Sequence, residues 1–472
     1  MLKKITLVKI VMLTVFAVSV QSCFVAKAYE RPHFEEIQNL YRTDQVPTDS
    51  SSMANISWRD VFTDPYLVRY IEKGLENNMD IRIALQQIAA AEAYAKQAKL
   101  NYLPVIAGNA GATRSHLSEN VPQGADLKHL GVDHVDRFEL SGSLSWEADI
   151  WGKIRSNKRA YVASYLQTVA AHKAIKTQLI ADIASTYYQL LALDQQLKVA
   201  EKTVVFRREG LETIKALKAA GEESRVAVDQ YAAQLYNAQS LLVDLKTSVF
   251  KAENTLSILL GETPRNFERL NLADERIDVD LDLGIPVLLL RNRPDVMAAE
   301  YQLVHAFELT HVARSDLYPS FTLSATGGLQ SSTFDKWFHT GSLFATLASG
   351  ILQPILNQRR VKTRYEVAKA QQKQALLNFE KTLLQAGKEV SNALYACHAE
   401  TEVFVYRQRE VEALRKAESD SKELLDNGFA NYLDLLTAGQ SALNAELGLI
   451  DNKLRQLTTL VSLYHALGGG WQ

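Results

Sequence analysis

The chain has 472 residues, of which 52 are Lys or Arg and 54 are Asp or Glu, so its formal net charge is -2. So balanced a charge gives no basic surface for nucleic acid, and we expect no nucleic-acid partner. Beyond Val20 no segment reaches the roughly 18 consecutive apolar residues of a membrane helix. If the mature protein crosses a bilayer, it must do so with strands.

The N-terminus has the pattern of a secretory signal peptide, because three lysines precede an apolar run from Ile10 to Val20. A small residue, Ser22, then stands before Cys23, and the end of the run resembles a bacterial lipobox. This resemblance implies cleavage of residues 1–22 and acylation of Cys23. The alternative is an ordinary signal peptide followed by an incidental cysteine.

The only other cysteine is Cys397, so no intramolecular disulfide is available once Cys23 carries lipid. It ends a set of residues spaced by three and four, which predicts one seam of a coiled coil: Leu376, Phe379, Leu383, Ala386, Val390, Ala393 and Cys397. We expect Cys397 to pack in this seam rather than to serve as a reactive thiol.

The chain contains two copies of one unit. A shift of 207 residues aligns Gly221 with Gly428 and needs no gap over residues 154–261. Upstream the shift becomes 215, which pairs Asp80 with Asp295. We therefore divide the mature chain into an N-terminal segment, a first repeat, a linker and a second repeat, at residues 23–76, 77–261, 262–292 and 293–472.

Long helices are predicted in each repeat, because no proline lies between Pro122 and Pro264 or after Pro354. A helix over 155–219 would be about 97 Å long. Helices over 224–259 and 78–100 would add about 54 and 35 Å, so that end to end they match the long one. An antiparallel bundle of columns of equal length follows.

A glycine marks the turn of each helical hairpin, Gly221 in the first repeat and Gly428 in the second. Ser224 and Asn431 follow as candidate N-caps of the next helix. These turns place the ends of both hairpins in one plane, so we predict that the tips contact a partner protein through Gly221, Glu222, Ser224, Gly428 and Asn431. The alternative is that the turns serve folding alone.

Two segments alternate strictly between apolar and polar residues, one from Phe138 to Asp149 and one from Phe321 to Gln330. Weaker strands are expected over 104–114 and 341–352, which gives four strands of about the length of a tilted membrane strand. Aromatic residues near the strand ends suit a membrane interface: Tyr102, Trp151, Tyr318 and Trp337.

Four strands cannot close a membrane barrel, since open edges in lipid leave backbone groups unpaired. We therefore expect an oligomer, and three copies would give twelve strands. The alternative for these strands is a soluble sandwich with one wet face.

The sequence resembles the outer-membrane factors typified by TolC, in particular their lipoprotein branch, over about residues 56–472. The likeness rests on the repeat together with the segments WRDVFTDPYL at 58–67, NMDIRIA at 78–84, WGKIR at 151–155, GIPVLLLRNRPDV at 284–296, NGFANYLDLL at 427–436 and LGGGW at 467–471.

This resemblance implies a mainly helical fold with a β-barrel part: a homotrimer with a twelve-stranded β-barrel and a twelve-helix α-barrel. A mixed equatorial region would include residues 24–76, 262–292 and the C-terminal end. It also implies a lipid-anchored channel of the outer membrane that extends into the periplasm. There it would form the passive exit of a tripartite efflux pump for drugs or other small toxic compounds, fed by a periplasmic adaptor and an inner-membrane transporter.

The second tip keeps the Leu-Asp-Leu of the family, at Leu433 to Leu435, whereas the first tip has Val226-Ala227-Val228. Thr437 stands where the drug-pump branch often has an acidic gate residue. We predict the gate at the second tip, formed by Leu433, Asp434, Leu436 and Thr437, with Asp434 as the available acidic ring. The alternative is that the leucines continue the coiled-coil seam and that Asp434 is a solvated flank.

We expect neither an enzyme nor a metal site, because phosphate-binding loops and zinc-protease motifs are missing and the ten histidines are scattered. We interpret His305 and His311 as surface polar residues. No cofactor is expected apart from the covalent lipid. Two other functions stay open, an exit duct for type I protein secretion and a non-channel coiled-coil protein of the envelope.

Overall fold

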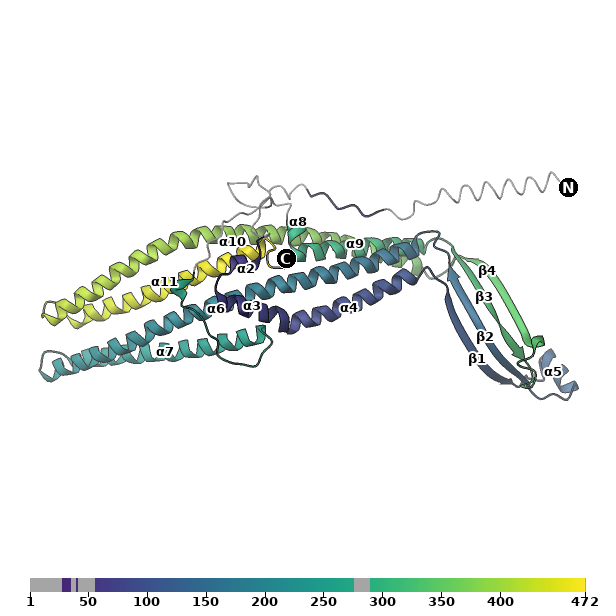
Figure 1. Ribbon diagram of the computed structural model, residues 1–472, viewed down its shortest axis with the longest axis horizontal. Coiled ribbons are helices and arrows are strands. Elements are labelled where there is room, and N and C mark those ends of the chain that lie inside the picture. The colour runs from purple at the N-terminus through teal and green to yellow at the C-terminus, as the bar shows by residue number, and fades with distance from the viewer. Residues whose placement is uncertain (1–27, 35–39, 41–55, 276–288, 472) are drawn as a thin grey trace. The chain divides into compact units, whose positions relative to one another are not determined.

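The computed structural model describes residues 28–34, 40, 56–275 and 289–471 (Figure 1). The predicted signal peptide and Cys23 lie outside these residues. The chain forms two compact units, the first made of Ala89–Leu166 and Glu300–Leu377 with the described residues up to Pro32, the second of the rest. Each unit contains segments of both repeats. In the described part, no helix is both long and apolar enough to cross a membrane.

Three helices of the first repeat have counterparts of equal length in the second. They have 22, 67 and 35 residues in both: α4 (Met79–Leu100), α6 (Lys153–Ala219) and α7 (Arg225–Leu259), then α9 (Pro294–Ser315), α10 (Arg360–Asp426) and α11 (Tyr432–Ala466). In the second unit, α7 lies beside α6 and α11 beside α10 (Figure 1). The predicted pairs of helical hairpins are therefore present.

Helices α7 and α4 meet end to end, as predicted. Gly261 follows α7 with a φ of 69°, and a Cβ atom there would lie 2.5 Å from the carbonyl oxygen of Asn77. The second repeat repeats this joint, where Gly468 follows α11 with a φ of 91° and lies against Asn292. Glycine is required at both joints, because any side chain would collide with the backbone just before α4 or α9, at the last residue of α3 or α8.

Short elements surround these joints: α2 (Trp58–Val61), α3 (Pro65–Asn77), η3 (Leu272–Asp274) and α8 (Leu289–Asn292). Aromatic residues tie them together. The Tyr70 hydroxyl donates to the carbonyl of Glu268, the Tyr464 hydroxyl to that of Ile56, and the Trp471 indole to that of Asn292. Described parts of the N-terminal segment, the linker and the C-terminal end thus pack together.

The first unit contains one antiparallel sheet in the order β1-β2-β3-β4: β1 (Val105–Ser115), β2 (Val135–Glu147), β3 (Ser320–Ser331) and β4 (Leu343–Leu352). The four strands match the four predicted ones. A short helix, α5 (Pro122–His129), lies in the connection from β1 to β2, and η5 (Thr340–Ser342) precedes β4.

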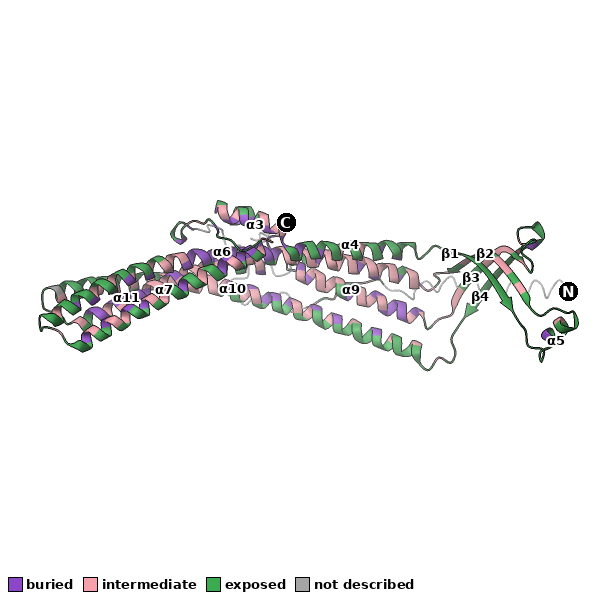
Figure 2. Ribbon diagram, turned by 90° about the horizontal axis from the view of Figure 1, so that it is seen from below, coloured by how far each residue is buried: buried purple, intermediate pink, exposed green. Residues whose placement is uncertain are grey.

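The register gives the sheet two different faces. Ile106, Leu144, Ala325 and Leu347 lie side by side across the four strands, and the next row on the opposite face is Ala107, Ser143, Thr326 and Thr346. Leu347 is 74% exposed and Ile106 73% exposed, so the apolar row is open on both edge strands, β1 and β4, which are coloured almost entirely as exposed in Figure 2. Within the described residues, β1 and β4 each pair with one strand only.

One detail differs from the sequence interpretation, and a second agrees with it only in part. His311 is buried at 8% exposure and contacts the Phe307 ring, with ring centres 4.7 Å apart, so it is not a surface residue. Cys397 is half-buried, although most of its predicted seam is buried, and burial raises the pKa of its thiol to about 11. The high pKa disfavours the reactive thiolate.

Candidate functional site: hairpin tips and the strand–helix junction

The first tip follows α6. Gly221 adopts a φ of 88°, and Glu222 donates its backbone N–H to the carbonyl of Leu217 at 3.0 Å. Ser224 then caps α7, because its hydroxyl accepts the N–H of Ala227 at 3.2 Å. Gly221, Glu222 and Ser224 are all exposed. The turn thus presents its polar groups to solvent.

The second tip repeats this turn after α10. Gly428 has a φ of 77°, and Asn431 accepts the N–H groups of Leu433 and Asp434 at 2.9 and 3.0 Å. The Asp434 carboxylate in turn accepts the backbone N–H of Asn431 at 3.3 Å, which completes a capping box. Phe429 is 82% exposed at this tip. Both predicted N-caps are therefore correct.

The two hairpins contact each other behind the tips. The Tyr432 hydroxyl donates to the Gln230 side chain at 3.1 Å, and the Tyr432 and Tyr231 rings lie 6.4 Å apart. Leu436 belongs to an apolar core that is otherwise formed by the first hairpin: Val204, Leu211, Ile214, Ala227, Tyr231, Leu235 and Ala238. Leu436 therefore joins the two hairpins of one chain.

The four predicted gate residues differ in exposure. Leu433 is 48% exposed, and Asp434 and Thr437 are exposed as well, whereas Leu436 is only 7% exposed. Leu433 and Thr437 lie one helical turn apart, so their side chains share a face of α11. The side chains available for a constriction are Leu433, Asp434 and Thr437, and Leu436 packs behind them.

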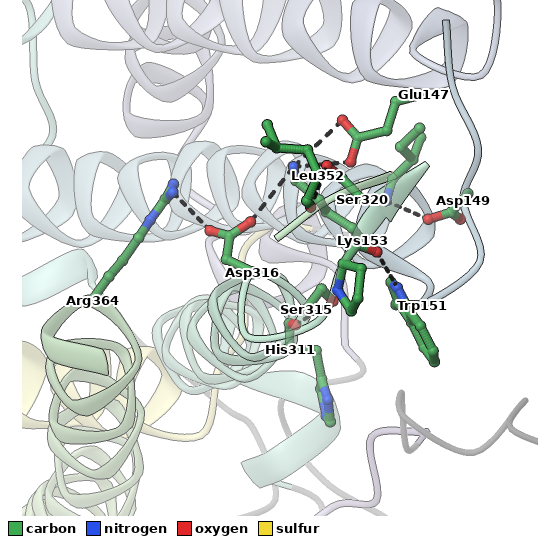
Figure 3. Close-up of polar contacts among 12 residues, drawn as sticks. Glu147, Asp149, Trp151, Lys153, His311, Ser315, Asp316, Ser320, Leu352 and Arg364 are labelled. Carbon is green, nitrogen blue, oxygen red and sulfur yellow. Dashed lines mark hydrogen bonds and ion pairs between the residues drawn. The ribbon is translucent and has the colours of Figure 1, made fainter. Parts of the chain in front are cut away.

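The segment from Asp149 to Lys153 builds the junction between β2 and α6 (Figure 3). The Asp149 carboxylate accepts the N–H groups of Ile154 and Arg155 at 2.8 and 3.1 Å and so caps α6. The Trp151 indole donates to the carbonyl of Pro319 at 2.7 Å. Its ring stacks on Tyr318, with ring centres 4.9 Å apart. These hydrogen bonds and the ring stacking hold residues 151–153 in place between β2 and α6.

Ion pairs extend this junction to α9 and α10. Lys153 pairs with Glu147 at 3.1 Å and with Asp316 at 3.5 Å, and Arg364 pairs with Asp316 at 2.8 Å (Figure 3). The Asp316 side chain is only 15% exposed. Asp316 therefore links the start of α6 with the N-terminal part of α10.

A buried acidic pair, Asp64 and Glu275, lies near α3 in the second unit, and both residues are 4% exposed. The Asp64 carboxylate caps α3 and also accepts the Tyr187 hydroxyl. Burial, followed by the hydrogen bond and charge of Asp64, raises the pKa of Glu275 to about 8. Glu275 thus holds a proton near neutral pH. No motif in the sequence identified this pair.

Most of the chain matches the profile of one protein family, described as "Outer membrane efflux protein", over residues 70–262 and 285–469. The chain belongs to the outer membrane efflux protein family. This family consists of transport channels, and the predicted family, the location in the outer membrane and the role in efflux are thereby confirmed.

Relatives of this efflux protein match it along nearly their whole length. The toluene efflux pump outer membrane protein TtgI of Pseudomonas putida is 29% identical over 419 residues, which are 88% of this chain and 87% of TtgI. The probable outer membrane lipoprotein SilC of Salmonella typhimurium is 26% identical over 452 residues, 94% of this chain and 95% of SilC. The structure of the outer-membrane channel OprN matches with a TM-score of 0.84 at 25% identity, covering 95% of this chain and 100% of OprN. The predicted fold class is confirmed.

Proposed function

We propose that three copies of this efflux protein assemble into one channel, whose twelve strands cross the outer membrane and whose helices continue it into the periplasm. The observation that supports the trimer is the four-stranded sheet, which has one apolar face, one polar face and, within the described ranges, two unpaired edges. An open edge in lipid costs several kcal/mol for each unpaired backbone group. Closure through neighbouring copies removes both edges and leaves the apolar face toward lipid.

The cargo in this proposal is a class of small toxic compounds, and the chain forms their passive exit. TtgI is described as part of a toluene efflux pump, and solvents of this kind are small and apolar. Energy would come from an inner-membrane transporter, as the family resemblance implies. The channel itself adds no chemistry and needs no cofactor.

The test is accumulation of a fluorescent efflux substrate and of toluene in cells that lack this gene. Loss of the gene should raise accumulation, and the wild-type chain should restore export. A chain with Gly221→Pro and Gly428→Pro, which cannot form either tip, should reach the membrane without restoring export. Unchanged accumulation together with loss of a secreted protein from the medium would instead favour type I protein secretion.

The adaptor would dock on the tips, where the two turns expose Glu222 and Asn431. Photo-crosslinking residues at these two positions should capture one periplasmic protein in living cells. The same group in place of Lys99, an exposed residue of α4, is the matched control and should not capture it. If assembled trimers capture the protein at Lys99 as efficiently as at Glu222 and Asn431, or at none of the three positions, the tips are not the docking site.

The gate would lie at the second tip. In a trimer each exposed side chain of α11 forms a ring, and rings of Leu433 and Thr437 would narrow the path while three Asp434 carboxylates would attract cations. Leu436 would support the gate from behind through its contact with the first hairpin. Lipid on Cys23 would anchor the chain to the outer membrane, and the relative SilC is named a probable outer membrane lipoprotein.

A further inference from the structure

Arg207 of α6 is the largest fully buried side chain of the described residues, with 1% exposure. Neither of its Nη atoms has a hydrogen-bond partner among those residues. A guanidinium group stays charged in proteins, and burial of a charge without a partner is strongly unfavourable. Desolvation accordingly lowers the pKa of Arg207, which the nearby Tyr231 and Glu418 counteract only in part.

This arginine extends from the first hairpin into the second. A Cβ atom at Gly439 of α11 would lie 3.3 Å from Arg207 Nη2 and 2.9 Å from Glu418 Oε1. Arg207 therefore lies against the backbone of α11 and close to a carboxylate of α10. The missing side chain at Gly439 makes the room that the guanidinium occupies.

A cavity of about 240 Å³ adjoins the Arg207 side chain. Its charged lining residues are Lys202, Arg207, Arg415, Glu418 and Glu446, three cations and two carboxylates. Arg415 binds both carboxylates, Glu418 at 3.1 Å and Glu446 in closer contact. The lining is therefore short of one negative charge, and the unsatisfied group is the buried guanidinium.

We propose that this cavity binds a small monovalent anion, with the size and charge of chloride, between the two hairpins and with Arg207 as its principal ligand. A single negative charge balances the lining, whereas the two charges of a sulfate would exceed the one positive charge that is left over. The bound anion would connect α6 of the first hairpin with α10 and α11 of the second. This site is separate from the predicted gate and from the tips.

The direct test is diffraction from crystals of the full-length protein in detergent, grown in bromide and measured at the bromine absorption edge. The wild type should give an anomalous peak within hydrogen-bonding distance of Arg207. Arg207→Gln should lose the peak. Arg208→Gln, a change at the exposed neighbour on the same helix, should keep it.

Three results would overturn the proposal. One is no peak in the wild type, with Arg207 paired instead to Glu418. The second is a side chain of a neighbouring subunit in the cavity. The third is a peak that persists in Arg207→Gln, which would mean an adventitious ion only.

Thermal unfolding gives a second test, and its first part uses the wild type alone. At constant ionic strength, replacement of methanesulfonate by chloride should raise the melting temperature to a plateau, as ligand binding to the folded state requires. Glu418→Gln should reach half of the rise at a severalfold lower chloride concentration, because a competing carboxylate is gone. A melting temperature that does not change with the chloride concentration would contradict the site.

Discussion

Asn78 and Arg293 make the same hydrogen bond in the two repeats. Asn78 Nδ2 donates to the carbonyl of Leu259 at 3.0 Å, and Arg293 Nη1 donates to the carbonyl of Ala466 at 2.9 Å. The two donors are equivalent under the upstream shift of the repeat, and the two acceptors under the downstream shift. Different residue types thus hold the same end-to-end joint between two helices.

The joint in the first repeat predicts a graded loss of stability. Asn78 also caps α4, since its Oδ1 accepts the N–H groups of Asp80 and Ile81 at 2.9 and 3.2 Å. Asn78→Asp keeps this cap and loses the bond to Leu259, so we expect a loss of about 1 kcal/mol. Asn78→Ala loses both, about 2 kcal/mol.

Thermal unfolding in detergent measures this series. Asn237→Ala, at an exposed position of α7, is the matched control and should melt like the wild type. If Asn78→Ala proves as stable as that control, the joint does not contribute to stability.

The buried acidic pair predicts a pH dependence. The pKa of Glu275 is about 8 in the folded protein and near 4.5 in the unfolded chain. The folded state therefore binds the extra proton, and the stability that this gives is complete below pH 4.5 and is lost as the pH rises through 8. Asp64 and Asp274 strengthen this effect, and Lys453 opposes it.

Glu275→Gln should abolish that loss, since an amide needs no proton to be neutral. At pH 8.5 it should be more stable than the wild type by on the order of 5 kcal/mol, and at pH 4.5 the two should melt alike. Glu76→Gln, an exposed change on α3, serves as control. Parallel curves of melting temperature against pH for wild type and Glu275→Gln would rule out this role.

The predicted gate is tested by planar-bilayer conductance. Leu433→Ala with Asp434→Asn should enlarge the single-channel current, because the apolar ring is smaller, and should make it less cation-selective, because the carboxylate ring is gone while an amide can still cap α11. Leu436→Ala should leave the current nearly unchanged and lower stability by about 2 to 5 kcal/mol, since its side chain packs in the core. A larger current from Leu436→Ala than from the double variant would indicate that the buried face of α11, and not the exposed one, forms the gate.

Lipidation is predicted at Cys23, which lies outside the described residues. Cells fed a labelled fatty acid should incorporate the label into the wild type and into Cys397→Ser, but not into Cys23→Ser. Label retained by Cys23→Ser would mean that the lipobox resemblance is misleading.

Periodic patterns predicted the regular elements well. The helix expected over 155–219 is α6, Lys153–Ala219, because a proline-free sequence with apolar residues at helical spacing has few alternatives. Helix α5 was not predicted, because its eight residues lack an apolar stripe and its N-cap residue Val121 makes no side-chain bond. Short helices of this kind depend on the connection in which they lie.

Side-chain environments were harder to predict than elements. Leu433 and Leu436 both belong to the apolar pattern of α11, and only the neighbouring hairpin decides that one is exposed and the other buried. Arg207 and Arg208 are adjacent and chemically identical, yet one is buried and one is exposed. The periodicity of one helix does not reveal which of its side chains a neighbouring helix covers.

The most direct test of the proposed channel is disulfide formation between the two edges of the sheet in neighbouring copies. In a Cys397→Ser background, Asn109→Cys on β1 is combined in turn with one change on the same face of β4: Phe344→Cys, Thr346→Cys, Ala348→Cys or Gly350→Cys. Asn109→Cys with Thr326→Cys, on the same face of the inner strand β3, is the control. At least one β1–β4 pair should give a covalent trimer and no larger species after mild oxidation of membranes, and the control should give none. Monomers throughout, or a ladder that continues beyond the trimer, would contradict a closed channel of three chains.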